Sequence, residues 1–331
     1  MRSSAAAVAD QAPARGWLAR LQPGLFAIPL GVLGLAGAWR RLAALDLAAA
    51  ASVADGLAWF ALALLALLLL LWAARLALHA DVLKQEWEHP VQGPLSALLP
   101  VTTLLGLAHL VALWPASAAA GLTVALAALV VLGAQAWQVV AKLSTGRIPG
   151  ELITPALYLP TVAGGFIGAL ALAALGLPGW AALLFGMGAG SWALLEMRIL
   201  NRLFAGPLPP PLRPTLGVEM APAAVGSLTL ATLWPELPAD VLVVCLGVAS
   251  GPVLAVLTRW RYWTAVPFSA GFWSFSFPLA AMASATAEAV RRGGWPASVA
   301  IIAVAIASMV ITFLAVRTLI LLPRGRLLPP A

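Results

Sequence analysis

The chain has 331 residues, of which 62% are hydrophobic and 9% are charged, and its net charge is +7. Soluble domains carry about 25% charged residues, so the composition excludes an ordinary soluble protein. The basic residues lie in short links between apolar runs, which excludes a nucleic-acid-binding protein. The single cysteine, Cys245, excludes an internal disulfide and a cysteine-based metal cluster.

Ten apolar segments follow one another along the chain, and each is close to the roughly 20 residues that cross a bilayer as a helix. An all-α integral membrane protein is expected, because a backbone in lipid must satisfy its own hydrogen bonds. The predicted spans are 22–40, 53–78, 91–113, 116–141, 153–175, 179–203, 213–233, 239–258, 268–290 and 296–321. Short links predict five antiparallel helical hairpins.

These hairpins are expected to form a single ten-helix domain over residues 16–323. A mobile N-terminal tail, 1–15, precedes it, and a cytoplasmic C-terminal tail, 324–331, follows it. Of the 19 basic residues, 15 lie in the tails and the even-numbered links, while the other side holds only Arg40, Arg41, Arg291 and Arg292. The positive-inside rule therefore predicts a multi-pass protein of the bacterial inner membrane with both termini in the cytoplasm.

A proline lies inside each odd-numbered span, and consecutive prolines are 71, 60, 62 and 56 residues apart. They are Pro29, Pro100, Pro160, Pro222 and Pro278. Because an interior proline kinks a helix, the alternation predicts an inner ring of five kinked helices around a pore and an outer ring of five straight helices. The alternative is that prolines are simply frequent in membrane helices. Pro252 in the eighth span departs from the alternation.

Enzyme motifs are absent: there is no HExxH, no phosphate-binding loop and no GxSxG. We therefore expect no enzyme, no cofactor and no metal site. Gly186 and Gly190 have the spacing of small residues that allow close helix packing, which is the function we predict for them.

Two acidic residues lie inside spans, where ionisable groups are expensive and suggest function. Glu196 precedes Arg198 by two residues, so an ion pair or a snorkelling side chain explains it as well as a function does. Glu219 precedes Pro222 by three residues. It could line the pore, where it would bind a cation or proton or repel anions, or it could be a structural residue that caps carbonyls freed at the kink.

The odd-numbered spans are otherwise nearly free of charge. A neutral path suits rapid passage of a monovalent ion helped by hydroxyl groups, here those of Thr102, Thr103, Thr161 and Ser276. Polarity alone does not set the sign of that ion. Phe277 precedes Pro278, so its ring either packs between helices or projects into the axis as a hydrophobic plug.

Five stretches of the chain resemble the tellurite-resistance/dicarboxylate transporter family, which is related to the plant slow-type guard-cell anion channels. They are EHPVQGPLSALLPVTTLL (88–105), TPALYLPTVAGGFIGALALAALG (154–176), SWALLEMRILNRL (191–203), RPTLGVEMAPAAVG (213–226) and PFSAGFWSFSFP (267–278). The resemblance implies a homotrimer in which each protomer has its own pore, and a gated channel for small monovalent anions.

The resemblance also implies that a phenylalanine on the ninth helix occludes the pore, and the FWSFSFP motif places it at Phe277. The residues expected at the kinks and along the pore wall are Phe26, Pro29, Pro100, Thr102, Pro160, Thr161, Pro222, Ser276 and Pro278. One alternative is a carrier of dicarboxylates, sulfite or tellurite-type oxyanions, coupled to protons through Glu219. Another is a non-conducting resistance factor that acts with a partner protein.

Two positions depart from the pattern expected of the family. Gly164 and Gly165 stand where an asparagine pair is expected after LPTVA. Glu219 stands where a neutral amide is expected, so a lumen-facing, ionised Glu219 would weaken anion conduction or make it depend on pH.

Overall fold

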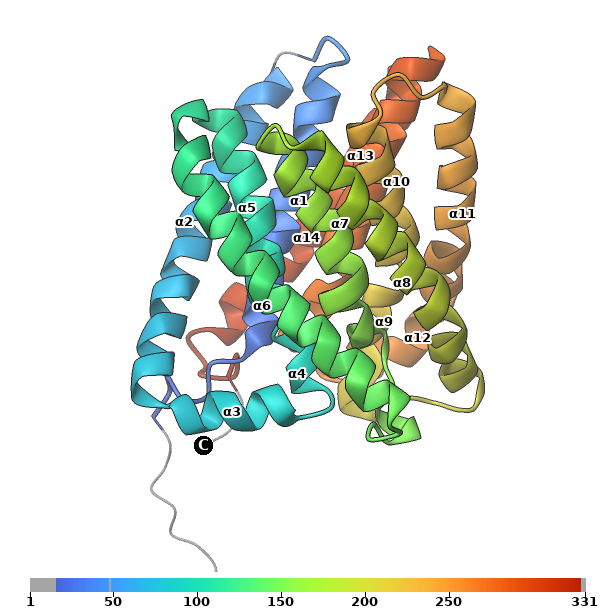
Figure 1. The fold of residues 1–331 in the computed structure, drawn as a ribbon. Coiled ribbons are helices and arrows are strands. Elements are labelled where there is room, and N and C mark those ends of the chain that lie inside the picture. The colour runs from blue at the N-terminus through green and yellow to red at the C-terminus, as the bar shows by residue number, and fades with distance from the viewer. Residues whose placement is uncertain (1–15, 48, 329–331) are drawn as a thin grey trace, which may run out of the picture.

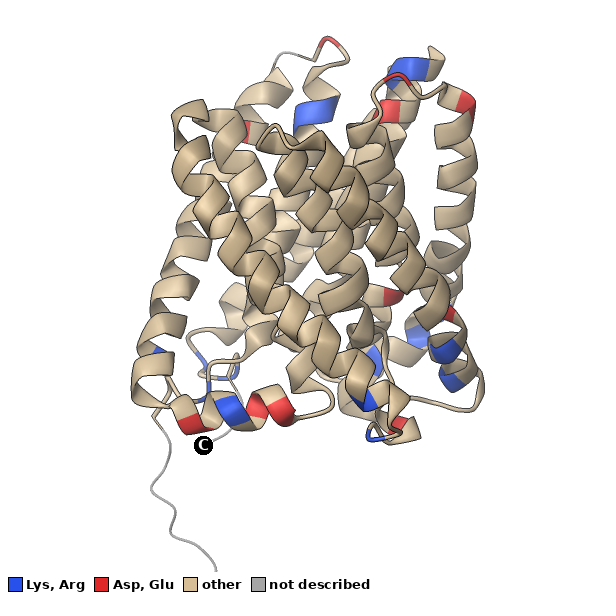
Figure 2. Ribbon diagram, viewed as in Figure 1, with Lys and Arg blue, Asp and Glu red and all other residues tan. Residues whose placement is uncertain are grey.

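The computed structural model describes residues 16–47 and 49–328, and this part of the chain consists of helices and loops without a strand. The predicted tail 1–15 lies outside the described residues, as do the last three residues of the predicted C-terminal tail. The helices run between the two ends of a bundle, and α1 begins at the end where α14 finishes (Figure 1). Lys, Arg, Asp and Glu lie mostly at the two ends (Figure 2).

Nine helical segments among the described residues are long and apolar enough to cross a membrane. They are Pro23–Ala43, Ala49–Leu78, Gln92–Leu113, Pro115–Ser144, Pro155–Ala174, Pro178–Phe204, Pro210–Leu233, Ala239–Thr258 and Ala297–Leu321. Each corresponds to one predicted span. The predicted span 268–290 is occupied by two shorter elements, η7 (Ala270–Phe275) and α13 (Ser276–Gly293), and α13 ends in a charged stretch. The count of ten spans stays a prediction.

Burial separates the spans into two groups that alternate along the chain. In the first, third, fifth and seventh spans, 56–89% of the apolar window is buried. In the five even-numbered spans, which include the last one, Ala297–Leu321, 11–28% of that window is buried. The main helices of the buried group are α1 (Ala27–Ala43), α5 (Leu98–Leu113), α7 (Gly164–Ala174), α10 (Ala221–Leu233) and α13. The exposed group is α2 (Ala49–Leu78), α6 (Ala118–Ser144), α8 (Pro178–Phe204), α11 (Ala239–Thr258) and α14 (Ala297–Leu321).

Each buried helix packs against two other buried helices. α1 packs on α5, α5 on α7, α7 on α10, α10 on α13, and α13 on α1, so the order of packing follows the chain and closes on itself. Each exposed helix contacts two consecutive buried helices: α2 covers α1 and α5, α6 covers α5 and α7, and α8 covers α7 and α10. In the same way α11 covers α10 and α13, and α14 covers α13 and α1.

Four of the five prolines lie in the first turn of a main buried helix and the fifth lies just before one, so each span is interrupted close to its proline, while the kink itself stays a prediction. Pro29, Pro100 and Pro278 are third residues of their helices, Pro222 is a second residue, and Pro160 lies in a π-helical turn before α7. The first turn of a helix tolerates proline because its N–H has no intrahelical partner there. Pro252 does lie inside a helix, α11.

Short separate elements precede each of these starts, so every buried span is broken near the end of the bundle where it begins. They are η1 (Pro23–Phe26), α4 (Gln92–Leu95), η4 (Pro155–Leu157) with η5 (Leu159–Ala163), η6 (Pro210–Thr215) with α9 (Leu216–Glu219), and η7. The 3₁₀ and π turns change the direction and pitch of the backbone where an α-helix would continue straight.

Helix α3 (Ala80–Glu88) lies across the same end of the bundle (Figure 1). The buried Arg75 of α2 holds it there, because two guanidinium nitrogens donate to the Glu86 carboxylate, each at 2.7 Å. One of these nitrogens also donates to the carbonyl oxygen of Ala19 at 2.9 Å. The arginine therefore joins the first described residues, α2 and α3.

Helices α7 and α8 approach each other closely at two glycines. A Cβ atom on Gly165 would lie 2.6 Å from the Cα of Gly188 and 2.8 Å from the carbonyl oxygen of Leu184. The packing function predicted for Gly186 and Gly190 is wrong within the chain, since a Cβ on either would meet nothing within 4 Å. Residues two apart point to nearly opposite sides of a helix, so Gly188 faces α7 and its neighbours do not.

Candidate functional site

A cavity of about 340 Å³ lies at the end of the bundle where the buried spans are broken. All five broken spans contribute to its wall, with pairs such as Ala27 and Leu30, Leu95 and Leu98, Leu159 and Val162, Val218 and Val225, and Trp273 and Phe277. The remaining lining is mainly apolar, and none of its described residues is charged. Polar groups come from Gln22, Gln92, Tyr158, Thr215, Ser269 and Ser274.

Phe277 lies in the wall of this cavity and also packs between helices. It is the second residue of α13, and only 6% of its surface is exposed. Its ring rests on α1 at Gly34, where a Cβ atom would lie 2.7 Å from the Phe277 Cδ2. Phe277 therefore packs between helices and lines the cavity, and its function as a hydrophobic plug in the axis stays a prediction.

The other predicted pore residues divide into two sets. Pro222 and Pro278 line the cavity together with Phe277. The residues that do not line it are Phe26, Pro29, Pro100, Thr102, Pro160, Thr161 and Ser276. Their place along a longer path stays a prediction.

Hydroxyl groups predicted to help an ion instead bond to the backbone near the helix breaks. Thr102 Oγ1 donates to the carbonyl oxygen of Phe26 at 3.1 Å, and Ser276 Oγ donates to that of Trp273 at 2.6 Å. Thr103 donates to the carbonyl oxygen of Leu99 in its own helix at 2.9 Å. Thr161 Oγ1 is buried without a hydrogen-bond partner. Three of the four hydroxyls thus stabilise the backbone of the buried helices behind the cavity.

Glu219 ends the short helix α9 and is buried, with 7% of its surface exposed. It is absent from the cavity lining, although Val218 and Ala221 on either side of it belong to that lining. Its Oε2 atom is buried and has no hydrogen-bond partner. Glu219 is close enough to Tyr158 and Glu196 to interact with both electrostatically. The carboxyl group therefore lies behind the cavity wall.

Tyr158 is a wall residue for which we predict no function from the sequence. Its hydroxyl donates to Glu196 Oε2 at 2.6 Å, and the indole N–H of Trp192 donates to the same oxygen at 2.7 Å. Glu196 is therefore held by Tyr158, which lies between η4 and η5, and by Trp192 of α8, and no ion pair joins it to Arg198 among the described residues. The sequence signals for Tyr158 were its place two residues before Pro160 and its position in the family-like stretch 154–176.

Comparison with known proteins finds similarity over nearly the whole chain. Residues 20–319 match the SLAC1 family, described as a voltage-dependent anion channel. The chain belongs to this family. It is also 32% identical to the tellurite resistance protein TehA homolog of Haemophilus influenzae over 313 residues, which cover 92% of each chain.

Membership of the SLAC1 family makes the chain a multi-pass membrane protein of an anion-transport family. Its members are transport proteins that work on small anions in a lipid environment. The predicted resemblance to the tellurite-resistance family is confirmed by the similarity to the TehA homolog. The gate, the path and the ion belong to the proposal that follows.

Proposed function

We propose that the chain is a gated anion channel whose path for small monovalent anions runs inside the five buried helices and is closed by Phe277. The cavity carries this proposal, because all five broken spans line it and Phe277 lies in its wall. The cyclic packing of α1, α5, α7, α10 and α13 supports it, since five helices that close on themselves can surround an axis. The exposed helices then face lipid or neighbouring protomers of the expected homotrimer.

The uncharged wall fits rapid passage better than tight binding. A charged lining would hold a multiply charged anion strongly, whereas conduction requires that an ion bind weakly enough to leave. The side-chain amides of Gln22 and Gln92 at the cavity can replace part of the water around a monovalent anion, whereas the hydroxyls of Tyr158, Thr215 and Ser274 already donate within the protein.

The test of this function is the reversal potential of the purified chain in a planar bilayer under a gradient of sodium nitrate. Phe277→Ala protein is used so that the current is large enough to measure. We expect the reversal potential to approach the equilibrium potential of nitrate. A potential near that of sodium, or no current from well-folded protein, would reject the anion channel.

A proton-coupled carrier is the second candidate, and the buried, unpartnered carboxyl oxygen of Glu219 favours it. A carrier gives saturable uptake of an oxyanion that depends on a pH gradient and gives no unitary currents. Uptake of labelled malate or sulfite into liposomes, with and without the gradient, separates the two.

The charge of Glu219 gives a further prediction within the channel proposal. In the Phe277→Ala protein, we expect Glu219→Gln to raise nitrate conductance about threefold at alkaline pH, where it removes the charge of an ionised carboxylate behind the cavity wall, and to change it little at acidic pH, where the carboxyl group is neutral. Single-channel recording provides the measurement. The matched control is Glu236→Gln, which changes an exposed carboxylate in the loop after α10 and is expected to have no effect. Equal conductance at alkaline pH with and without Glu219→Gln would show that the residue is structural.

A further inference from the structure

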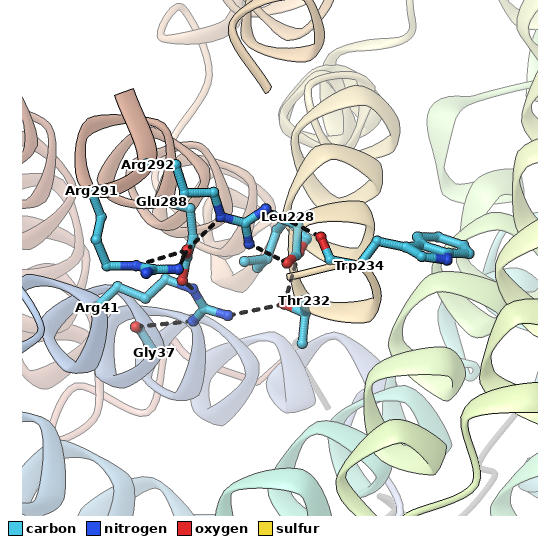
Figure 3. Close-up of polar contacts among 9 residues, drawn as sticks. Gly37, Arg41, Leu228, Thr232, Trp234, Glu288, Arg291 and Arg292 are labelled. Carbon is cyan, nitrogen blue, oxygen red and sulfur yellow. Dashed lines mark hydrogen bonds and ion pairs between the residues drawn. The ribbon is translucent and has the colours of Figure 1, made fainter. Parts of the chain in front are cut away.

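Three arginines gather around one carboxylate at the end of the bundle opposite the cavity. Arg41 belongs to the last turns of α1, and Glu288, Arg291 and Arg292 belong to the last turns of α13 (Figure 3). Glu288 lies 11 residues after Phe277, which is roughly 16 Å of helix rise. Arg41, Arg291 and Arg292 are three of the four arginines that the positive-inside rule places on the side of the membrane opposite the cytoplasm. The four side chains carry a local net charge of +2.

The Glu288 carboxylate holds all three guanidinium groups. Arg291 Nη2 donates to Glu288 Oε2 at 2.8 Å, and Arg291 Nε donates to the same oxygen at 3.3 Å. Arg41 Nε lies 3.4 Å from Oε1, and Arg292 Nε lies 3.4 Å from Oε2. The Nε atoms of Arg41 and Arg292 are buried and make no hydrogen bond. Two guanidinium N–H groups, those of Arg41 Nε and Arg292 Nε, therefore lie beside the carboxylate without a hydrogen bond.

The three arginines differ in what else they contact. Arg292 is structural: its terminal nitrogens donate to the carbonyl oxygens of Ala231 at 2.6 Å and Trp234 at 3.2 Å, and so cap the end of α10. Arg41 donates to Thr232 Oγ1 at 3.1 Å and to the carbonyl oxygen of Gly37 at 3.2 Å. Arg291 bonds to Glu288, and 42% of its side chain is exposed. In this cluster Arg292 is therefore largely buried, whereas the guanidinium group of Arg291 is accessible.

Arg41 lies inside the cycle of buried helices. Its bond to Thr232 joins α1 to α10, and these two helices are not consecutive in the cycle because α13 separates them. His109 of α5 lies near the same point, because a Cβ atom on Gly37 would lie 3.5 Å from Arg41 Nη1 and 3.8 Å from His109 Nε2. Side chains of α10 and α13 therefore contact the Arg41 guanidinium group, which also bonds to Gly37 of its own helix (Figure 3).

We propose that this cluster is a binding site for small monovalent anions, in which Arg41 and Arg291 hold the anion and Glu288 competes with it for the same donors. The site rests on the proposed function in one respect, because the position of Arg41 places it at the second mouth of the conduction path. Guanidinium groups bind oxyanions through paired N–H donors, and nitrate offers the same flat array of oxygens as the carboxylate of Glu288.

Glu288 sets the strength of the site. Three arginines without a counter-charge would bind an anion too tightly for it to leave, and conduction requires weak binding. A carboxylate that shares the donors lowers the affinity and occupies the guanidinium groups when no anion is present. The structural alternative is that the four side chains only tie α1, α10 and α13 together at their carboxyl ends, where positive charge is favourable.

Thermal unfolding of the purified full chain in detergent tests the site without any flux measurement. Sodium nitrate replaces sodium gluconate at constant ionic strength, and the dissociation constant follows from the rise of the unfolding midpoint with nitrate. We expect Glu288→Gln to lower the dissociation constant about tenfold, and Arg291→Gln to raise it about fivefold. Arg40→Gln is the control at the same end, since Arg40 pairs with Asp55 outside the cluster, and we expect no change.

Several outcomes would overturn the site. Unchanged nitrate affinity in both Glu288→Gln and Arg291→Gln would do so, as would an effect of Arg40→Gln equal to that of Arg291→Gln. If Glu288→Gln does not fold, the half-exposed Arg291 decides the question alone. If nitrate binds with the expected pattern among the variants but the Phe277→Ala protein gives no current, the proposed binding site stands and the proposed channel function is rejected. Current together with unchanged binding would leave the channel and reject the site.

Discussion

Phe277→Ala is expected to raise the anion conductance of the reconstituted protein at least about tenfold, which corresponds to about 1.4 kcal/mol of barrier. The ring lies in the wall of the cavity and is pressed against α1 at Gly34, so it stands between the cavity and the rest of the buried helices. A hydrophobic constriction of this kind excludes water and ions. Alanine removes the ring and leaves α13 unchanged, since alanine is a good helix former. Single-channel recording and nitrate efflux from liposomes measure the effect.

Phe275→Ala is the matched control for this gate. Phe275 lies two residues earlier and is buried to a similar extent, but it belongs to an aromatic group with Trp263, at a ring distance of 4.5 Å, and does not line the cavity. Both variants delete the same volume, and loss of a buried phenylalanine costs about 3–5 kcal/mol where the site cannot collapse. We expect Phe275→Ala to destabilise the protein without raising conductance. Equal conductance gains in the two variants would show that loosened packing, and not a gate, is responsible.

The division of the chain into spans could be predicted because it depends on composition and length alone. Nine of the ten predicted spans correspond to helices that are long and apolar enough to cross a membrane. The period of the prolines also marked which helices are buried, since each proline belongs to one of the mostly buried spans. It could not show where each span breaks. A proline is compatible with both a kink and a first turn, and the surrounding contacts decide between them.

The candidate site depended on contacts between residues far apart in sequence. Phe277 drew attention through its neighbour Pro278 and through the family resemblance, while Gly34 and Tyr158 did not. Gly34 matters because the ring of a residue 243 positions later rests on it. Tyr158 matters because Glu196 of another helix holds its hydroxyl at the cavity. Neither the contact between Phe277 and Gly34 nor the hydrogen bond between Tyr158 and Glu196 produces a recognisable pattern in the sequence around these residues. The four arginines on the far side were visible in the sequence, but it did not show that Glu288 is the common partner of three of them, Arg41, Arg291 and Arg292.

The departure at Gly164 and Gly165 has a physical reason in the packing of α7 on α8. The three atoms nearest to a Cβ atom on Gly165 would be backbone atoms of Gly188 and Leu184, at 2.6–2.8 Å. Backbone cannot rotate away as a side chain can, so the helices would have to separate. A Cβ atom on Gly164 would instead meet the side chain of Leu132 of α6 at 3.4 Å, which is an ordinary contact with a group that can move.

We therefore expect opposite results from placing at these two positions the asparagine that the family pattern suggests. Gly165→Asn should lower the free energy of unfolding by about 1–3 kcal/mol or prevent folding, because it overpacks a contact made by backbone. Gly164→Asn should stay within about 1 kcal/mol of the unchanged protein, since Leu132 can adopt another rotamer. Gly186→Asn, where a Cβ meets nothing within 4 Å, corrects for the change of helix propensity. Thermal unfolding in detergent and the yield of monodisperse protein are the measurements. Equal stability of the Gly165 and Gly186 variants would mean that α7 and α8 do not need their close approach.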